Sequence, residues 1–396
     1  MDYIRSKLPT QTVLSIDSIN LFQKKYVAPS IVDVKFKKSV TSGRVALTLA
    51  LQNAGISNND EVLIPAYHCS SMVEPAIYLG AKPVFFRVNK DTTIDYDDIV
   101  SKITTTTKAI IIAHYFGFPQ PIQPIRELCD KNKILLIEDC AHSFFGSIDG
   151  LPIGSYGDYA IVSAMKFFPV YDGGYLVSDH INLDKVLLQH SSIIFELKSF
   201  LNVLEKSFSY NRLKLLKLLL GWIFKAKDTL WGKIKRMSSA INTDAHTPPS
   251  SDGGFSLDAR WLNKEMSFAS KAIIRFTDVK KLIGNRKNNY LYLNNAIAKI
   301  EGCTPLYPTI SDATVPYVVP VLVDNPIIIF SKLKQCGVPI IRFGEFLWPG
   351  VDSNICQNST YLSAHVFQFP CHQSLTQSEL DWMITKIADA SYNANK

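Results

Sequence analysis

Lys166 lies in a segment that suits a lysine used for covalent chemistry. It follows an apolar run at 159–162 and comes three residues after Ser163, in Ser163-Ala-Met-Lys166-Phe-Phe-Pro. A lysine that forms a Schiff base needs a fixed loop, and a nearby hydroxyl can bind a phosphate group. The segment therefore predicts that Lys166 binds pyridoxal 5'-phosphate (PLP), with Ser163 at the phosphate. A surface lysine is the simple alternative, although apolar neighbours argue against it.

Asp139 ends another apolar run, Leu136-Ile-Glu-Asp139-Cys-Ala-His142. PLP chemistry needs a carboxylate against the pyridine nitrogen, because a protonated ring is the better electron sink. Asp139 could supply that carboxylate, and His142 would lie near the same ring. The alternative is that Asp139 caps a following helix, and the motif alone does not decide between the two.

Ser42-Gly43-Arg44 stands at the entry to a helical pattern. A helix N-terminus offers free N–H groups and the positive end of a dipole, which together favour a bound phosphate. Ser-Gly before a helix is also an ordinary N-cap. Both interpretations stay open on this motif alone.

These residues need elements that bring them to one place. Apolar runs at 61–65, 83–88, 109–114, 134–138, 159–162 and 174–177 are typical of strands, and helical patterns at 44–54, 72–79 and 125–131 separate several of them. The alternation predicts an α/β fold with a large, doubly wound, mostly parallel sheet. Ligands bind at the carboxyl ends of such strands.

The second half of the chain changes character. A helical pattern covers 195–234, and we expect one long helix at 266–300, a strand at 314–323 and helices at 327–336 and 375–393. With 396 residues, two domains are expected. The first, 1–255, would be the PLP-binding domain with a helical insert at about 186–250. The second, 256–396, would hold the long helix and a smaller α+β domain.

Composition limits the class of protein. Hydrophobic residues make up 47% and charged residues 19%, which indicates a folded chain. The seven cysteines show no CxxC pair, so we expect reduced thiols and no metal site. No signal peptide or membrane-spanning run is evident, and a cytoplasmic location is expected. The net charge of +7 resides in 196–236, so nucleic-acid binding is not expected.

Together the motifs resemble the DegT/DnrJ/StrS-type sugar aminotransferase family, a branch of the fold-type I PLP enzymes. The resemblance covers roughly 35–180 and 255–393. The similar stretches are Ser-Gly-x-x-Ala-Leu at 42–47, Asp-Glu-Val-Leu-Ile-Pro at 60–65, His-Tyr-Phe-Gly at 114–117, Ile-Glu-Asp-Cys-Ala-His at 137–142, Asp-Gly-Gly at 172–174 and Phe-Pro-Cys-His-Gln-Ser-Leu-Thr at 369–376.

The resemblance implies a fold-type I PLP-transferase fold, a homodimer and further site residues. Asn263 falls where family members supply an asparagine to the phosphate site of the partner subunit. Arg342 matches an arginine of many relatives and could pair with a substrate carboxylate, although a surface ion pair is its alternative. Two departures mark a divergent branch. Lys166 lies three residues after the serine instead of five, and Cys69 occupies the position of the ring-stacking aromatic. His68 or Tyr67 would then have to stack on PLP, and His68 is the favoured one, although a Tyr-His pair in a loop could equally be structural.

The function implied is transfer of an amino group, with L-glutamate as donor, to a keto group of a sugar or nucleotide sugar, as in surface polysaccharide biosynthesis. A PLP-dependent sugar dehydratase and a non-catalytic PLP-fold regulator or scaffold are the alternatives. Dehydrating relatives usually carry histidine in place of Lys166.

Residues 196–236 combine an apolar stripe with a lysine face. This pattern predicts either a peripheral contact with an anionic membrane surface, at the inner face, or packing of amphipathic helices on the domain or the dimer partner.

Overall fold

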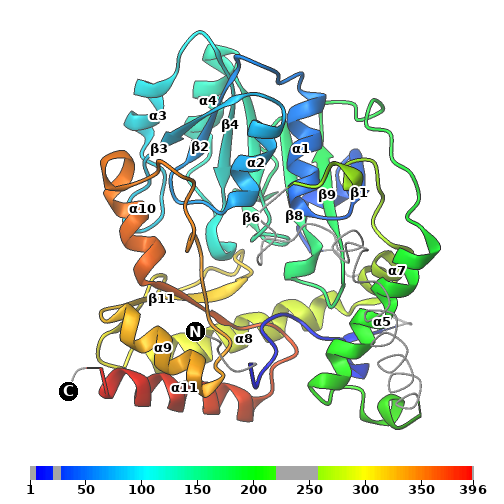
Figure 1. The fold of residues 1–396 in the computed structure, drawn as a ribbon, viewed down its shortest axis with the longest axis vertical. Helices are drawn as coiled ribbons and strands as arrows, with labels where there is room; N and C mark the ends of the chain where they lie inside the picture. Colours follow the sequence, from blue (N-terminus) through cyan, green and yellow to red (C-terminus); the bar gives the residue numbers. More distant parts are fainter. Residues whose placement is uncertain (1–5, 21–27, 220–256, 395–396) are drawn as a thin grey trace, which may run out of the picture.

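The structure is a computed structural model, and it describes residues 6–20, 28–219 and 257–394. A sheet of seven strands forms the larger part (Figure 1). Its strands, in spatial order, are β1 (Phe36–Val40), β9 (Gly174–Ser178), β8 (Tyr159–Ser163), β5 (Leu135–Asp139), β4 (Thr107–Ala113), β2 (Glu61–Pro65) and β3 (Lys82–Phe86). Only β9 runs against its neighbours, so the sheet is mostly parallel as expected.

Helices cover both faces of this sheet. On one face α1 (Gly43–Asn53) packs against β8 and β9, beside α2 (Ser70–Tyr78). On the other, α3 (Tyr96–Lys102) and α4 (Gln123–Asn132) pack against β3 and β5. Alternate residues serve the two layers: Ile111 of β4 belongs to the core under α1, and Ile110 to the core under α4. Burial on both faces explains why these strands are continuous apolar runs.

A second, antiparallel sheet forms the C-terminal part. Its order is β10 (Cys303–Pro305), β11 (Val318–Val323), β13 (Val366–Pro370) and β12 (Ile341–Arg342). The helices of this part are α8 (Val279–Ile297), α9 (Pro326–Cys336), α10 (Ser353–His365) and α11 (Gln377–Tyr392). The fold-type I architecture with a smaller α+β region is confirmed. The expected domain boundary at 255 lies outside the described residues and stays a prediction.

The single long helix expected at 266–300 is wrong. The chain forms α7 (Phe268–Phe276) and then α8, with Thr277 extended between them. Asp278 ends the continuity because its side chain accepts a hydrogen bond from the N–H of Lys281, as an N-cap does. Thr277 also forms a bridge with Ile19, a contact that no local pattern reveals.

The helical pattern expected over 195–234 is interrupted, because α5 (Ile193–Ser209) ends at Ser209 and the chain is helical again at 214–219. Residues 220–234 lie outside the described part of the chain. The strand expected at 314–323 is shorter, since β11 begins at Val318. Among the described residues, no helix is both long and apolar enough to cross a membrane.

Candidate active site

The lysine loop begins directly after the C-terminal end of β8 with a short 3-10 turn, Ala164–Lys166. Lys166 and Ser163 both line the pocket at the carboxyl ends of the strands. The Asp-Gly-Gly turn braces this loop, because the carbonyl of Gly173 accepts the N–H of Ala164 at 3.0 Å. Gly174 has no room for a side chain, since a Cβ would lie 2.4 Å from the carbonyl carbon of Ser42. The loop is therefore fixed, as a Schiff-base lysine requires.

Asp139 lies at the end of β5 and lines the same pocket. Burial raises the pKa of its carboxyl group, while the nearby charge of Lys166 opposes that shift. Its Oδ1 accepts the N–H of Ala141 at 2.9 Å. No helix follows among the described residues, since the next element is the two-residue strand β6 (Ser147–Ile148). The helix-cap interpretation of Asp139 is therefore wrong.

His142 forms one wall of the pocket within an aromatic cluster. Its ring stacks on Tyr317 at 4.8 Å between ring centres, and Phe343 meets it edge-on at 5.2 Å. Its Nδ1 accepts the N–H of Phe116 at 3.2 Å. Burial and the charge of Lys166 hold its pKa well below the usual value, so the ring is neutral and its proton resides on Nε2. His142 is thus a hydrogen-bond donor at the pocket.

The N-terminus of α1 forms another side of the pocket, with Ser42, Gly43 and Arg44 among its lining residues. The hydroxyl of Ser42 accepts the N–H of Val45 at 3.3 Å, so the N-cap interpretation is confirmed. Ser42 thus caps the helix and also lines the pocket. The guanidinium of Arg44 forms a buried ion pair with Glu74 at 3.3 Å.

His68 does not reach the pocket. It is fully buried, its Nδ1 donates to the carbonyl of Pro65, and its Nε2 accepts the N–H of Trp348 at 2.9 Å. Its ring is stacked on Phe85 at 5.0 Å. Since its face and both nitrogens are occupied, the structure gives no support to His68 as the residue that stacks on PLP. Cys69, its neighbour, does line the pocket.

Arg342 and Asn263 also lie away from the pocket. Arg342 pairs with Glu345 and lies over the ring of Phe330 at 4.6 Å, as in its surface-ion-pair alternative. Asn263 is exposed in the segment before α7, and its carbonyl accepts the N–H of Gln189 at 2.7 Å. Its exposure leaves the predicted role toward a partner subunit untested.

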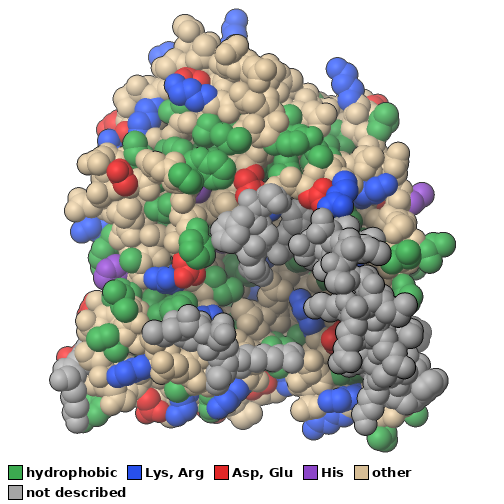
Figure 2. All heavy atoms as spheres, in the orientation of Figure 1, with side chains coloured by type: hydrophobic (Ala, Val, Ile, Leu, Met, Phe, Trp, Pro, Cys, Tyr) green, Lys and Arg blue, Asp and Glu red, His purple; other side chains and the backbone are tan. Residues whose placement is uncertain are grey.

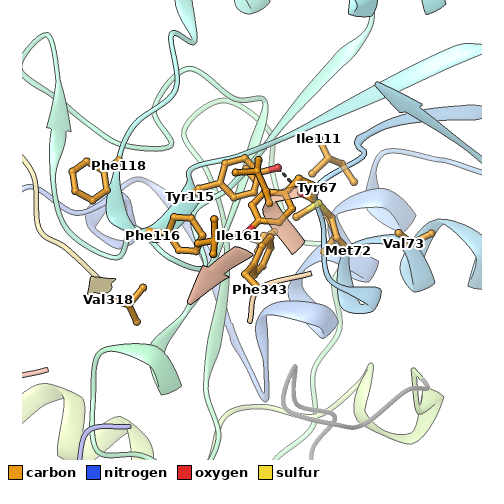
Figure 3. Close-up of a cluster of buried hydrophobic side chains, with 14 of the residues drawn as sticks. Tyr67, Met72, Val73, Ile111, Tyr115, Phe116, Phe118, Ile161, Val318 and Phe343 are labelled. Atoms are coloured by element: carbon orange, nitrogen blue, oxygen red, sulfur yellow. Dashed lines mark hydrogen bonds between the residues drawn. The ribbon is translucent and has the colours of Figure 1, made fainter. Parts of the chain in front are cut away.

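Sequence reasoning missed two features that shape the site. His114 and Glu138 form a pair with no exposed side-chain surface, 2.8 Å apart. Because the Nδ1 of His114 accepts the N–H of Gln120, its Nε2 carries the proton and donates to Glu138. The second feature is Phe343, which reaches the pocket from the smaller sheet (Figure 3). His114 and Glu138 each stand in one of the family-like stretches, 114–117 and 137–142, so the sequence contained a signal for the pair. No local pattern indicated Phe343.

The described residues include no group of three or more His, Cys, Asp or Glu side chains placed to hold a metal ion. The donors that do converge are a lysine, a carboxylate, a neutral imidazole, a hydroxyl and a helix N-terminus. This set fits PLP, which carries an aldehyde, a basic ring nitrogen, a ring hydroxyl and a phosphate.

The family model of the DegT/DnrJ/EryC1/StrS aminotransferase family matches residues 2–212, more than half of the chain. The chain belongs to this family. DegT/DnrJ/EryC1/StrS enzymes are PLP-dependent sugar aminotransferases, and this chain is a distant member. Its similar relatives include a GDP-perosamine synthase of Vibrio cholerae, 35% identical over 161 residues, which are 39% of this chain and 43% of the relative.

A second relative is a UDP-N-acetyl-3-dehydro-alpha-D-glucosamine 3-aminotransferase of Acidithiobacillus ferrooxidans, 35% identical over 153 residues, or 37% of this chain and 41% of the relative. These alignments span only about two fifths of each relative. The PLP form of Spr1654 from Streptococcus pneumoniae has the same fold, with a TM-score of 0.64 at 16% identity, over 92% of this chain and 89% of that one.

Proposed function

We propose that this chain is an aminotransferase that uses PLP to move an amino group from L-glutamate to a keto group of a nucleotide-linked sugar. Biosynthesis of a surface polysaccharide is the proposed setting. One observation carries the proposal. Lys166, Asp139, His142, Ser163 and the N-terminus of α1 come from three separate stretches of the sequence and line one pocket.

Each of these groups has a proposed role. PLP, when bound, supplies an electron sink that stabilises negative charge on the substrate carbon. The amino group of Lys166 links to the cofactor and, once the amino donor displaces it, carries a proton from the donor Cα. The carboxylate of Asp139 keeps the ring nitrogen protonated. The Nε2–H of His142 donates to an oxygen on the ring.

The phosphate end of the site is proposed at the N-terminus of α1. The backbone N–H groups at the start of α1 and the hydroxyl of Ser163 provide donors, and the helix dipole favours an anion there. Asn263 of a second subunit would add one more donor. This role for Asn263 requires two subunits, so the proposed assembly is a homodimer.

The sugar acceptor is supported by the relatives. One is named for a UDP-linked dehydro-sugar and the other for GDP-perosamine. Since they match this chain over only part of their length, the acceptor is proposed at the level of class.

An absorption spectrum of purified protein with added PLP tests the proposal. We expect a visible band that the Lys166→Ala variant lacks, and L-glutamate should convert that band to the shorter-wavelength form of the aminated cofactor. Keto sugars linked to UDP, GDP or dTDP should then restore the original band. A wild-type protein that stays colourless with PLP would contradict the proposal and favour the scaffold alternative.

A further inference from the structure

Arg286 is a buried cation that contacts the backbone of the reactive lysine. It lies in the middle of α8, and no part of its side chain is exposed. Its Nη2 donates to the carbonyl of Lys166 at 2.9 Å, and its Nη1 donates to the carbonyl of Tyr317 at 3.0 Å. The guanidinium also lies over the ring of Phe167 at 4.5 Å. Removing an arginine from water is costly, so full burial requires these partners.

Gln373 and Thr12 complete the same set of contacts. The amide of Gln373 donates to the carbonyl of Phe167 at 2.8 Å, while its Oε1 accepts Nε of Arg286 at 2.9 Å. The hydroxyl of Thr12 accepts Nη2 of Arg286 at 3.2 Å and lies 3.4 Å from the carbonyl of Phe167. Three side chains from distant parts of the sequence therefore meet at two successive carbonyls. We call Thr12, Arg286 and Gln373 the carbonyl clamp.

The contacts are directed at two carbonyls of the loop that accept no turn bond from the backbone of the described residues. Within the turn, the N–H groups of Phe167 and Phe168 both bond to the carbonyl of Ala164. The carbonyls of Lys166 and Phe167 are the ones that the clamp binds. Arg286 also binds the backbone of Tyr317, whose ring lies 5.5 Å from Nζ of Lys166 and stacks on His142. One cation thus fixes both the lysine backbone and the aromatic wall beside its amino group.

We propose that the carbonyl clamp positions Lys166 so that its amino group meets the bound cofactor. Its three members are positioning residues, because none of them lines the pocket. This inference rests on the proposed function, in which Lys166 links to PLP. It predicts that a weakened clamp slows the covalent step at Lys166 and leaves reversible binding of the phosphate group in place.

The variant Gln373→Glu separates positioning from folding. A carboxylate at 373 can pair with Arg286, so the unfolding temperature of the apoprotein should be unchanged or higher. It cannot donate to the carbonyl of Phe167, so one contact on the loop is lost. Thr12→Val and Arg286→Lys remove other contacts of the clamp. Gln120→Glu is the matched control, because Gln120 is also buried and its amide donates to a carbonyl, that of Thr92, away from the pocket.

The measurement is the rate at which saturating PLP becomes fixed to Lys166 by borohydride, read by mass spectrometry of the Lys166 peptide. Total bound PLP is measured on the same samples. We expect fixation to slow about fivefold in Gln373→Glu and at least tenfold in Arg286→Lys, with total binding unchanged. Gln120→Glu should behave as wild type.

Wild-type rates in folded Gln373→Glu and Arg286→Lys would overturn the clamp and leave the proposed function standing. An equal loss in Gln120→Glu would also overturn it, because the effect would then reflect general destabilisation. A wild-type protein that fixes no PLP at Lys166 would overturn both proposals together.

Discussion

The charge on Asp139 can be removed by a substitution that keeps the shape of its side chain. Asp139 is half-buried at the pocket, and the charge of Lys166 favours its ionised form. Asp139→Asn keeps the shape and removes the negative charge that would hold the ring nitrogen protonated. We expect PLP still to link to Lys166, while conversion by L-glutamate slows on the order of 100-fold. Stopped-flow absorbance measures this rate. Asp149→Asn, an exposed position, is the control.

Two buried histidines should make stability depend on pH. Burial lowers the pKa of His68 to about 4 and that of His372 to about 3, below the ordinary value of 6.5. The unfolded chain therefore binds more protons than the folded chain in this range. The contribution of these two histidines to the free energy of unfolding is fully present above about pH 6.5. It is lost as the pH falls toward about 4.

For His68 alone, the free energy of unfolding should fall by about 3 kcal/mol between these two pH values. Urea unfolding at a series of pH values should show a shallower dependence for His68→Gln than for wild type. The same substitution at His190, whose side chain is 94% exposed, should leave the dependence unchanged. Parallel curves for wild type and His68→Gln would refute this assignment.

At the scale of elements, α5 is tied to the lysine loop through Asp172. This buried carboxylate accepts the hydroxyl of Ser199 in α5 at 3.1 Å. It also accepts the hydroxyls of Ser267 at 2.5 Å and Ser270 at 2.7 Å, and the N–H of Ser267 at 2.8 Å. Since Asp172 precedes the glycines that brace Ala164, this network connects the insert and α7 to the active-site turn.

Ser199→Ala should therefore destabilise the protein by about 2 kcal/mol, because the lost hydrogen bond ends on a charged acceptor. Ser207→Ala is the matched control on the same helix. The Ser207 hydroxyl is equally buried but bonds only to the carbonyl of Val203 within α5, so its loss should cost under about 1 kcal/mol. Chemical denaturation measures both. An equal loss in free energy of unfolding for the two variants would show that the hydrogen bond from Ser199 to Asp172 adds no special stability.

At the scale of the whole molecule, the proposed dimer should share its two sites. Asn263 is exposed and away from the pocket of its own subunit, whereas Lys166 lines that pocket. Mixed dimers of Lys166→Ala and Asn263→Ala subunits would then contain one site with both native residues. We expect each variant alone to show little transamination, and the remixed sample to recover about a quarter of wild-type activity if half of the dimers are mixed. A monomer by light scattering would contradict the prediction.

The outward face of α5 carries exposed apolar side chains. Phe195 and Val203 are buried against the chain, while Ile193 is 87% exposed and Leu197 58% exposed. On the face drawn in Figure 2, described Lys and Arg side chains are scattered among other types instead of forming one stripe. Packing on a dimer partner and docking on an anionic membrane both stay predictions. Flotation of folded wild type with anionic liposomes, lost in Ile193→Ser/Leu197→Ser, would support the membrane.

The local sequence determined much of this protein. Periodicity placed β2 at its observed bounds and α1, α9 and α11 to within two residues, because buried strands and amphipathic helices carry their patterns within a few residues. The motifs also placed Lys166, Asp139, His142, Ser163 and Ser42 at one pocket, since strand ends of a doubly wound sheet meet at one edge.

Only the tertiary structure decided the contacts between distant segments. It packed His68 away from the pocket, brought Phe343 into it, and joined Thr12, Arg286 and Gln373 at the lysine backbone. Arg286 is buried on the same side of α8 as Leu282 and Tyr290, but no sequence pattern indicated this burial or which carbonyls the guanidinium binds. Hydrogen-bond partners far apart in sequence leave no periodic signal, because only the folded chain brings them together.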